Sequence, residues 1–188
     1  MIEIIERTPV RPARTLLLIG PGGAGKSMLG VQLAPLLGRA LIDLDHEFLG
    51  RIGDISTFIR DAGYASYKTR NAQLAGEIIC EITTPAVLVA SSGFMTPDNP
   101  PLALEANRAL LASTYSICLL PTRSLETSAS IIVERQLTRP FSSGRFREDA
   151  RIRARYPVYA KLGDAIIFST APAIEIAKAV ARFLHGRI

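Results

Sequence analysis

The stretch Gly20-Pro21-Gly22-Gly23-Ala24-Gly25-Lys26-Ser27 decides the fold of this 188-residue chain. It matches the Gly-x-x-x-x-Gly-Lys-Ser pattern of a phosphate-binding loop. The apolar run at 16–19 predicts a buried strand before it, and the residues from Ser27 onward predict a helix after it. In such a unit, backbone N–H groups and the positive end of the helix dipole converge on a phosphate group.

The residues of this loop have predicted roles. Lys26 is expected to reach the β- and γ-phosphates of a nucleoside triphosphate, which we take to be ATP. The Ser27 hydroxyl is expected to ligate Mg²⁺. The predicted nucleotide-binding residues of this region are Gly22, Gly23, Ala24, Gly25, Lys26, Ser27 and Met28.

Short apolar runs alternate with amphipathic segments along the rest of the chain. The predicted strands are 15–19, 40–43, 86–90, 115–120 and 164–169, and the predicted helices are 26–37, 64–81, 101–112, 124–137 and 172–184. Strict alternation predicts an α/β fold, in which a parallel sheet carries helices on both faces. Irregular segments at 92–101 and 139–148 should lie beyond the carboxyl ends of the strands, where such sheets bind ligands.

Composition favours one compact domain, residues 1–188, because 48% of the chain is hydrophobic. No apolar run reaches the ~18 residues of a membrane span, and charges interrupt the N-terminal extension at 1–14, so we expect a cytoplasmic protein without a membrane partner. Cys80 and Cys118 stand in apolar surroundings and predict two buried free thiols.

The net charge of +5 comes mostly from arginine. Six arginines gather between positions 139 and 155, without the aromatic residues of a base-stacking surface. This cluster favours a phosphate-handling lid over a nucleic-acid partner, and we expect a monomer acting on a small hydroxylated acid.

The second predicted strand ends on two acids. Asp43 and Asp45 are spaced i, i+2, which on a strand would place both carboxylates on one face near the phosphate loop. One carboxylate can hold the water shell of Mg²⁺ while the other meets an acceptor hydroxyl. Solvated acids at a strand end are the alternative.

At this point the chain resembles the shikimate kinase family of small ATP-dependent kinases. The phosphate loop is followed by Leu29-Gly30 and Leu33-Ala34, then by Asp43-x-Asp45, Arg139-Pro140 and Arg155-Tyr156-Pro157-Val158-Tyr159. The resemblance implies a three-layer P-loop kinase fold with a five-stranded parallel sheet of order 2-3-1-4-5. It also implies a mobile lid at about 138–150 and a place in aromatic amino acid biosynthesis.

Carried over by position, the resemblance implies the remaining roles. Asp43 would sit in the Mg²⁺ shell, and Asp45 would orient and deprotonate the acceptor hydroxyl. Arg139 would be the lid arginine that closes on the γ-phosphate, and Arg135 would lie against the adenine. Arg155 would pair with an acceptor carboxylate, so the implied catalytic residues are Lys26, Asp45 and Arg139.

Two departures from the family fall in the predicted acceptor pocket. Lys68 stands where the family has an arginine, and it lacks the planar fork that holds a carboxylate. Ser91-Ser92-Gly93 replaces three consecutive glycines. The predicted acceptor-binding residues are Asp45, Lys68, Ser92, Gly93 and Arg155.

These departures leave alternatives open. The acceptor is shikimate or a related acid, such as a gluconate-like sugar acid. A non-catalytic ligand sensor of this fold would act through a partner, since residues 1–14 are too short for a helix-turn-helix. A nucleoside or nucleotide kinase would need a base-reading pocket that the sequence does not reveal.

Overall fold

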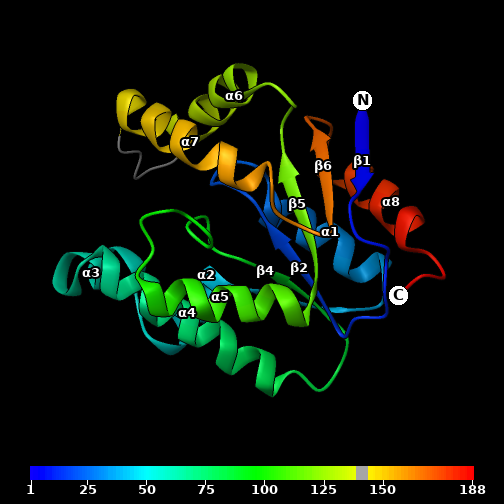
Figure 1. The fold of residues 1–188 in the computed structure, drawn as a ribbon, viewed down its shortest axis with the longest axis horizontal. Coiled ribbons are helices and arrows are strands. Elements are labelled where there is room, and N and C mark those ends of the chain that lie inside the picture. The colour runs from blue at the N-terminus through cyan, green and yellow to red at the C-terminus, as the bar shows by residue number, and fades with distance from the viewer. Residues whose placement is uncertain (139–143) are drawn as a thin grey trace.

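The computed structural model describes residues 1–138 and 144–188 (Figure 1). Its strands are β1 (Ile2–Glu6), β2 (Thr15–Ile19), β3 (Ala40–Asp43), β4 (Ala86–Val89), β5 (Tyr115–Leu120) and β6 (Ala165–Ser169). Its helices are α1 (Lys26–Leu36), α2 (Leu44–Arg51), α3 (Ile55–Ala62), α4 (Tyr64–Glu81), α5 (Pro101–Ser113), α6 (Leu125–Leu137), α7 (Arg145–Tyr159) and α8 (Ala173–Leu184).

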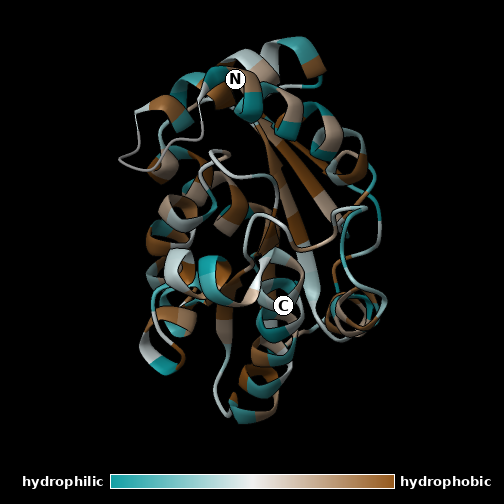
Figure 2. Cartoon of the chain, turned by 90° about the vertical axis from the view of Figure 1, so that its left-hand side faces the viewer, coloured by the Kyte–Doolittle hydropathy of each residue, from teal (hydrophilic) through white to brown (hydrophobic). Residues whose placement is uncertain are grey.

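The central strand β2 shows why the chain folds into layers. All five of its side chains are buried, and alternate residues face opposite sides of the sheet. Leu16 and Leu18 join a core with α1 and α8, whereas Leu17 and Ile19 join a core with α4, α5, α6 and α7. Burying one such side chain stabilises the fold by roughly 1.5–3 kcal/mol. Figure 2 shows the strands as apolar ribbons between helices of mixed character.

The sheet has six strands in the order β1-β6-β5-β2-β4-β3, so the prediction of five strands in the order 2-3-1-4-5 is wrong for the whole sheet. The difference is β1, which lies within the expected N-terminal extension and pairs antiparallel with β6. The other pairs are parallel. Ile2 and Ile4 pack on the α1–α8 side, while Glu3 forms an ion pair with Arg123 (2.5 Å).

Two further predictions are corrected, and the lid at about 138–150 stays a prediction, with helix α7 beginning within it at Arg145. Asp45 does not lie on a strand, because β3 ends at Asp43 and α2 begins at Leu44. Cys118 is buried, but Cys80 is exposed, since it lies on the outer side of α4, opposite the buried Leu74 and Ile78.

No helix among residues 1–138 and 144–188 combines the length and the apolar character needed to cross a membrane.

Candidate active site

The phosphate loop, residues 20–27, connects β2 to α1 at the carboxyl edge of the sheet (Figure 1). Gly25 precedes the helix with a φ of +101°, a left-handed conformation that disfavours other residues. A side chain at Gly22 would lie 2.5 Å from Gln136 Nε2. The backbone at Gly25 therefore favours glycine, whereas a side chain at Gly22 would require the end of the Gln136 side chain to move. The loop presents the N-terminus of α1 to a ligand.

The two reactive side chains of the loop differ in exposure. The Lys26 side chain is buried, and its ammonium donates to the Pro21 carbonyl at 3.2 Å. Ser27 is exposed in the first turn of α1. Lys26 thus lies along the loop, where a bound phosphate would be, and Ser27 is accessible at the start of α1.

A pocket of about 310 Å³ adjoins this loop. It brings together five of the predicted nucleotide-binding residues, Gly23, Ala24, Gly25, Met28 and Arg135. The Arg135 guanidinium donates to the Gly23 carbonyl at 3.1 Å, which fixes α6 against the loop. The pocket is also lined by residues that were not predicted to bind nucleotide, although one of them, Ser169, ends a predicted strand at the ligand-binding edge: Ser169, Ala171, Ala173 and Ile176.

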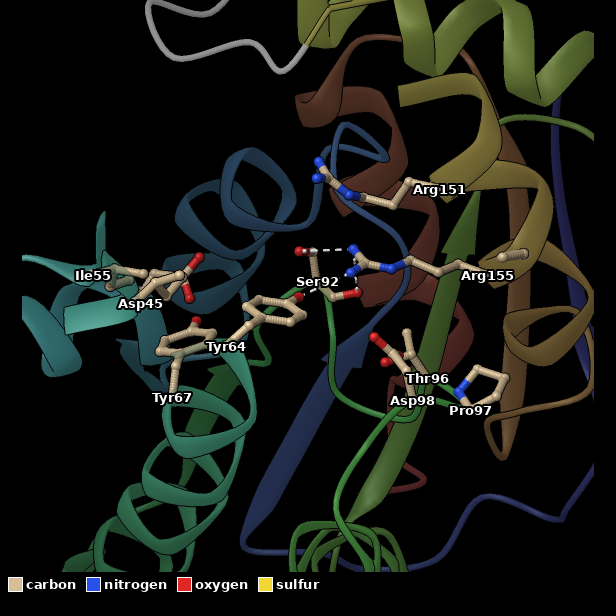
Figure 3. Close-up of a pocket in the computed structure, with 12 residues that line it drawn as sticks. Asp45, Ile55, Tyr64, Tyr67, Ser92, Thr96, Pro97, Asp98, Arg151 and Arg155 are labelled. Atoms are coloured by element: carbon tan, nitrogen blue, oxygen red, sulfur yellow. Dashed lines mark hydrogen bonds between the residues drawn. The ribbon is translucent and has the colours of Figure 1, made fainter. Parts of the chain in front are cut away.

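A larger pocket, of about 700 Å³, lies beside Asp45 and Arg155. Figure 3 shows these two side chains on opposite sides, with Tyr64 between them. Of the predicted acceptor-binding residues, Asp45, Ser92 and Arg155 line this pocket. Its other lining residues are Ile55, Ile59, Tyr64, Tyr67, Thr96, Pro97, Asp98, Arg151 and Ala154, none of which the sequence reading assigned to the acceptor.

Arg155 is held at the floor of this pocket. It is buried, its Nη2 donates to the Tyr64 hydroxyl at 3.0 Å, and its Nη1 contacts Ser92 O and Oγ at 3.4 Å. The Tyr159 hydroxyl donates to the same Ser92 carbonyl at 2.9 Å. These contacts fix a cationic group at the end of α7, in a position to meet an anionic substrate.

Asp45 is positioned by two polar side chains. The Asn71 amide donates to Ser91 Oγ at 3.1 Å, and the Ser91 hydroxyl donates to Asp45 Oδ1 at 2.5 Å. Tyr67 lies beside this group, where burial and the Asp45 carboxylate raise the pKa of its hydroxyl. The arrangement leaves an exposed carboxylate with a fixed orientation at the pocket edge, suited to accept a proton.

The comparisons with known proteins agree with this geometry. A family model described as shikimate kinase matches residues 22–185. The chain belongs to the shikimate kinase family.

Individual relatives support the family assignment. A shikimate kinase of Halorhodospira halophila is 30% identical over 191 residues, covering 96% of this chain and 97% of the relative. One of Coxiella burnetii is 30% identical over 156 residues, covering 80% of this chain and 82% of the relative.

Solved structures share the fold. A shikimate kinase from Acinetobacter baumannii in complex with shikimate superposes with a TM-score of 0.73 at 23% identity, covering 95% of this chain and 94% of that one. The shikimate kinase of Aquifex aeolicus gives a TM-score of 0.71 at 20% identity, covering 92% and 96%.

Lys68, the first predicted departure from the family pattern, is buried and paired. Its side chain is 3% exposed, and its ammonium forms an ion pair with Asp98 Oδ1 at 2.6 Å. It also donates to Thr96 Oγ1 at 3.2 Å and lies 4.7 Å from the centre of the Tyr64 ring. Lys68 is therefore a neighbour of the pocket wall, with its charge directed to Asp98.

The serines of the second departure occupy defined positions. Ser91 is buried and faces Asp45, while Ser92 contacts Arg155. Gly93 lies close to the hydrogen-bonded pair of Tyr64 and Arg155, since an added Cβ would lie 3.2 Å from the Tyr64 hydroxyl and 3.9 Å from Arg155 Nη2. Arg139, the predicted lid arginine, lies outside the described residues.

Proposed function

We propose that this chain transfers the γ-phosphoryl group of ATP to a hydroxyl of shikimate or a closely related hydroxylated acid. The observation that carries the proposal is the shared pocket of Asp45 and Arg155, which offers a base and a cation on opposite sides. The separate pocket at the phosphate loop and Arg135 supports ATP as the donor.

The residues divide the reaction between them. Arg155 holds the acceptor carboxylate, and Asp45 accepts the proton as the acceptor O–H bond breaks. The acceptor oxygen then bonds to the γ-phosphorus while the bond to the ADP oxygen breaks. Lys26 and the N–H groups at the start of α1 stabilise the charge that develops on the phosphoryl oxygens.

The residues at the loop also fit Mg²⁺. Ser27 supplies a hydroxyl and Asp43 a carboxylate, and both are oxygen ligands of the kind Mg²⁺ prefers. No cluster of three or more His, Cys, Asp or Glu within the described chain could hold a metal alone, so phosphate oxygens and water would complete the shell. When bound, the ion would neutralise charge on the transferred phosphate.

An ADP-release assay with shikimate, quinate and gluconate tests the proposal. We expect turnover with shikimate, and Lys26→Ala should reduce kcat by about 10²-fold or more, because it removes a charged donor to the phosphates. Arg155→Ala should raise the acceptor KM about 10- to 100-fold, the loss expected for a charge-assisted hydrogen bond, with little change in the ATP KM.

Arg155→Lys is the matched control, because it keeps the charge but loses the fork, and it should fall between wild type and Arg155→Ala. A melting curve for each variant separates binding from folding. Absence of turnover with every acid would contradict the proposal.

A further inference from the structure

The Lys68 ammonium is buried among three groups of the described residues. Asp98 Oδ1, Thr96 Oγ1 and the face of Tyr64 surround it, and 3% of the side chain is exposed. Burial lowers the pKa of Lys68, while the Asp98 carboxylate acts to raise it. A desolvated ammonium of this kind requires an anionic partner, and Asp98 supplies it.

Lys68 and Arg155 approach one point from two sides. A Cβ built on Gly93 would lie 3.8 Å from Lys68 Cε, 3.9 Å from Arg155 Nη2 and 3.2 Å from the Tyr64 hydroxyl. The Tyr64 hydroxyl accepts from Arg155, and Asp98 accepts from Lys68. The cationic groups of Lys68 and Arg155 thus lie near Gly93, and each already donates to an oxygen atom of this chain.

Asp98 is the more easily displaced of these oxygen groups. Its side chain is 64% exposed, although Lys68 beneath it is almost fully covered. The loop that carries it, residues 90–100, has its own hydrogen bonds. Asn99 Nδ2 donates to the carbonyls of Gly93 (3.1 Å) and Phe94 (2.8 Å), and Thr96 Oγ1 donates to Gly93 O at 3.1 Å. The loop can therefore keep its shape when the Asp98 carboxylate turns to solvent.

We propose that Asp98 occupies the place of the acceptor carboxylate, and that a carboxylated acceptor must displace it from Lys68. This inference rests on the proposed function, in which the acceptor is a hydroxylated acid. Asp98 then sets the affinity for the acceptor, because the binding-competent state is only the fraction in which Lys68 has been released.

The opposite role would have the opposite consequence. If Asp98 instead accepted hydrogen bonds from acceptor hydroxyls, it would strengthen binding of every acceptor, charged or neutral. The sign of the change in KM on removing its charge separates the two roles.

Asp98→Asn is the principal test, because it removes the charge and nearly keeps the shape. We expect the KM for shikimate to fall about 3- to 10-fold, as the competing carboxylate is lost. The KM for ATP and the KM for the methyl ester of shikimate, which has no carboxylate, should stay unchanged. Glu105→Gln, an exposed position on α5, is the control for net charge and should match wild type.

A double-mutant cycle links the effect to Lys68. Lys68→Met should raise the shikimate KM. Adding Asp98→Asn to Lys68→Met should not lower this KM, since the two side chains act as a pair. A fall in KM of equal size in both backgrounds would overturn the proposal. If Asp98→Asn is poorly folded, Asp98→Ala replaces it in the same test, because it also removes the carboxylate and exposes Lys68 to water.

A binding readout separates this inference from the proposed function. The chain has four lysines, so ¹⁵N-lysine labelling gives a Lys68 signal that Lys68→Met identifies. A Lys68 shift on adding shikimate without turnover would sink the proposed function and keep the Asp98 proposal. Turnover with an unchanged or raised KM in Asp98→Asn would overturn the Asp98 proposal alone. If neither turnover nor a Lys68 shift is observed with shikimate, both proposals are overturned.

Discussion

Ser91 shows how one added hydroxyl can change an active site without filling it. The side chain turns away from the acceptor space and lies between Asn71 and Asp45. Because the Asn71 amide N–H can only donate, the Ser91 proton is directed to the Asp45 carboxylate. Glycine at this position could not make this contact, whereas Ser91 fixes the orientation of Asp45, the proposed base.

Ser91→Ala should therefore lower kcat about tenfold, the effect expected for a hydrogen bond to a charged group of ~1.5 kcal/mol. The acceptor KM should change by less than about threefold, because Ser91 holds the base and not the substrate. Steady-state kinetics with a melting curve checks this. Ser91→Thr keeps the hydroxyl and should recover much of kcat; equal loss in both variants would argue that packing alone is affected.

That Asp45 and Arg155 lie in one pocket could be predicted at this scale, because each belongs to a short motif with a chemical requirement. The partners of Lys68 could not. Its ion pair with Asp98 joins residues thirty positions apart, and only the folded path of the loop at 90–100 brings them together. Local sequence also misplaced Asp45 on a strand, since Asp43 accepts from the Asp45 N–H at 3.0 Å and so starts a helix.

At the scale of elements, Asp164 joins the N-terminal segment to the sheet. Its carboxylate accepts from the Ser116 N–H and hydroxyl, each at 2.8 Å, and from Arg11 at 3.0 Å. Its backbone carbonyl accepts from the N–H groups of Arg7 and Thr8. One residue thus links the ends of β1, β5 and β6.

Asp164→Asn should lower the free energy of unfolding at pH 7 by about 1–3 kcal/mol, because several charge-assisted hydrogen bonds are weakened. Partial burial acts to raise the pKa of Asp164, but the Ser116 and Arg11 contacts outweigh it, and the pKa lies below its usual value. The stabilisation is present above the unfolded pKa of ~3.9 and is lost as the pH falls through the folded pKa.

Urea unfolding at pH values between 7 and 2 measures this effect. The difference between wild type and Asp164→Asn should shrink below about pH 4. Asp61→Asn, which removes an exposed partner of Arg60, should cost less than ~1 kcal/mol throughout. A difference that is constant with pH would show that the Asp164 charge is not responsible.

The parallel strands could be predicted because each is a short apolar run, and β2, β4, β5 and β6 are almost wholly buried, although Ala40 and Leu41 of β3 are exposed. β1 could not, because Glu3 and Glu6 interrupt it and one of its edges faces solvent. Its pairing depends on a tertiary contact with β6 and on the ion pair of Glu3 with Arg123.

In the whole molecule, helices α6 and α7 connect the pocket at the phosphate loop with the pocket beside Asp45 and Arg155. Arg135 on α6 contacts the phosphate loop, and Arg155 and Tyr159 on α7 contact Ser92 in the other pocket. The two helices pack against each other, and the expected lid at about 138–150 follows α6 and includes the start of α7. A ligand that fixes one helix should therefore favour the bound position of the other.

We expect a non-hydrolysable ATP analogue to lower the Kd for the acceptor by about fivefold or more, and the acceptor to lower the Kd of the analogue by the same factor. Tyr159→Phe should reduce this factor, because it removes the hydrogen bond from α7 to Ser92. Calorimetric titrations of each ligand with and without the other provide the measurement. Independent Kd values would contradict the coupling.

The aromatic side chains of the pocket beside Asp45 and Arg155 have an optical consequence. The chain contains no tryptophan and five tyrosines, so its ultraviolet emission comes from tyrosine alone. Tyr64 and Tyr67 stack there with ring centres 5.8 Å apart, and Tyr64 also contacts two cations. Any acid that rearranges those cations changes the surroundings of the fluorophores, so the unlabelled protein carries its own reporter for the substrate it receives.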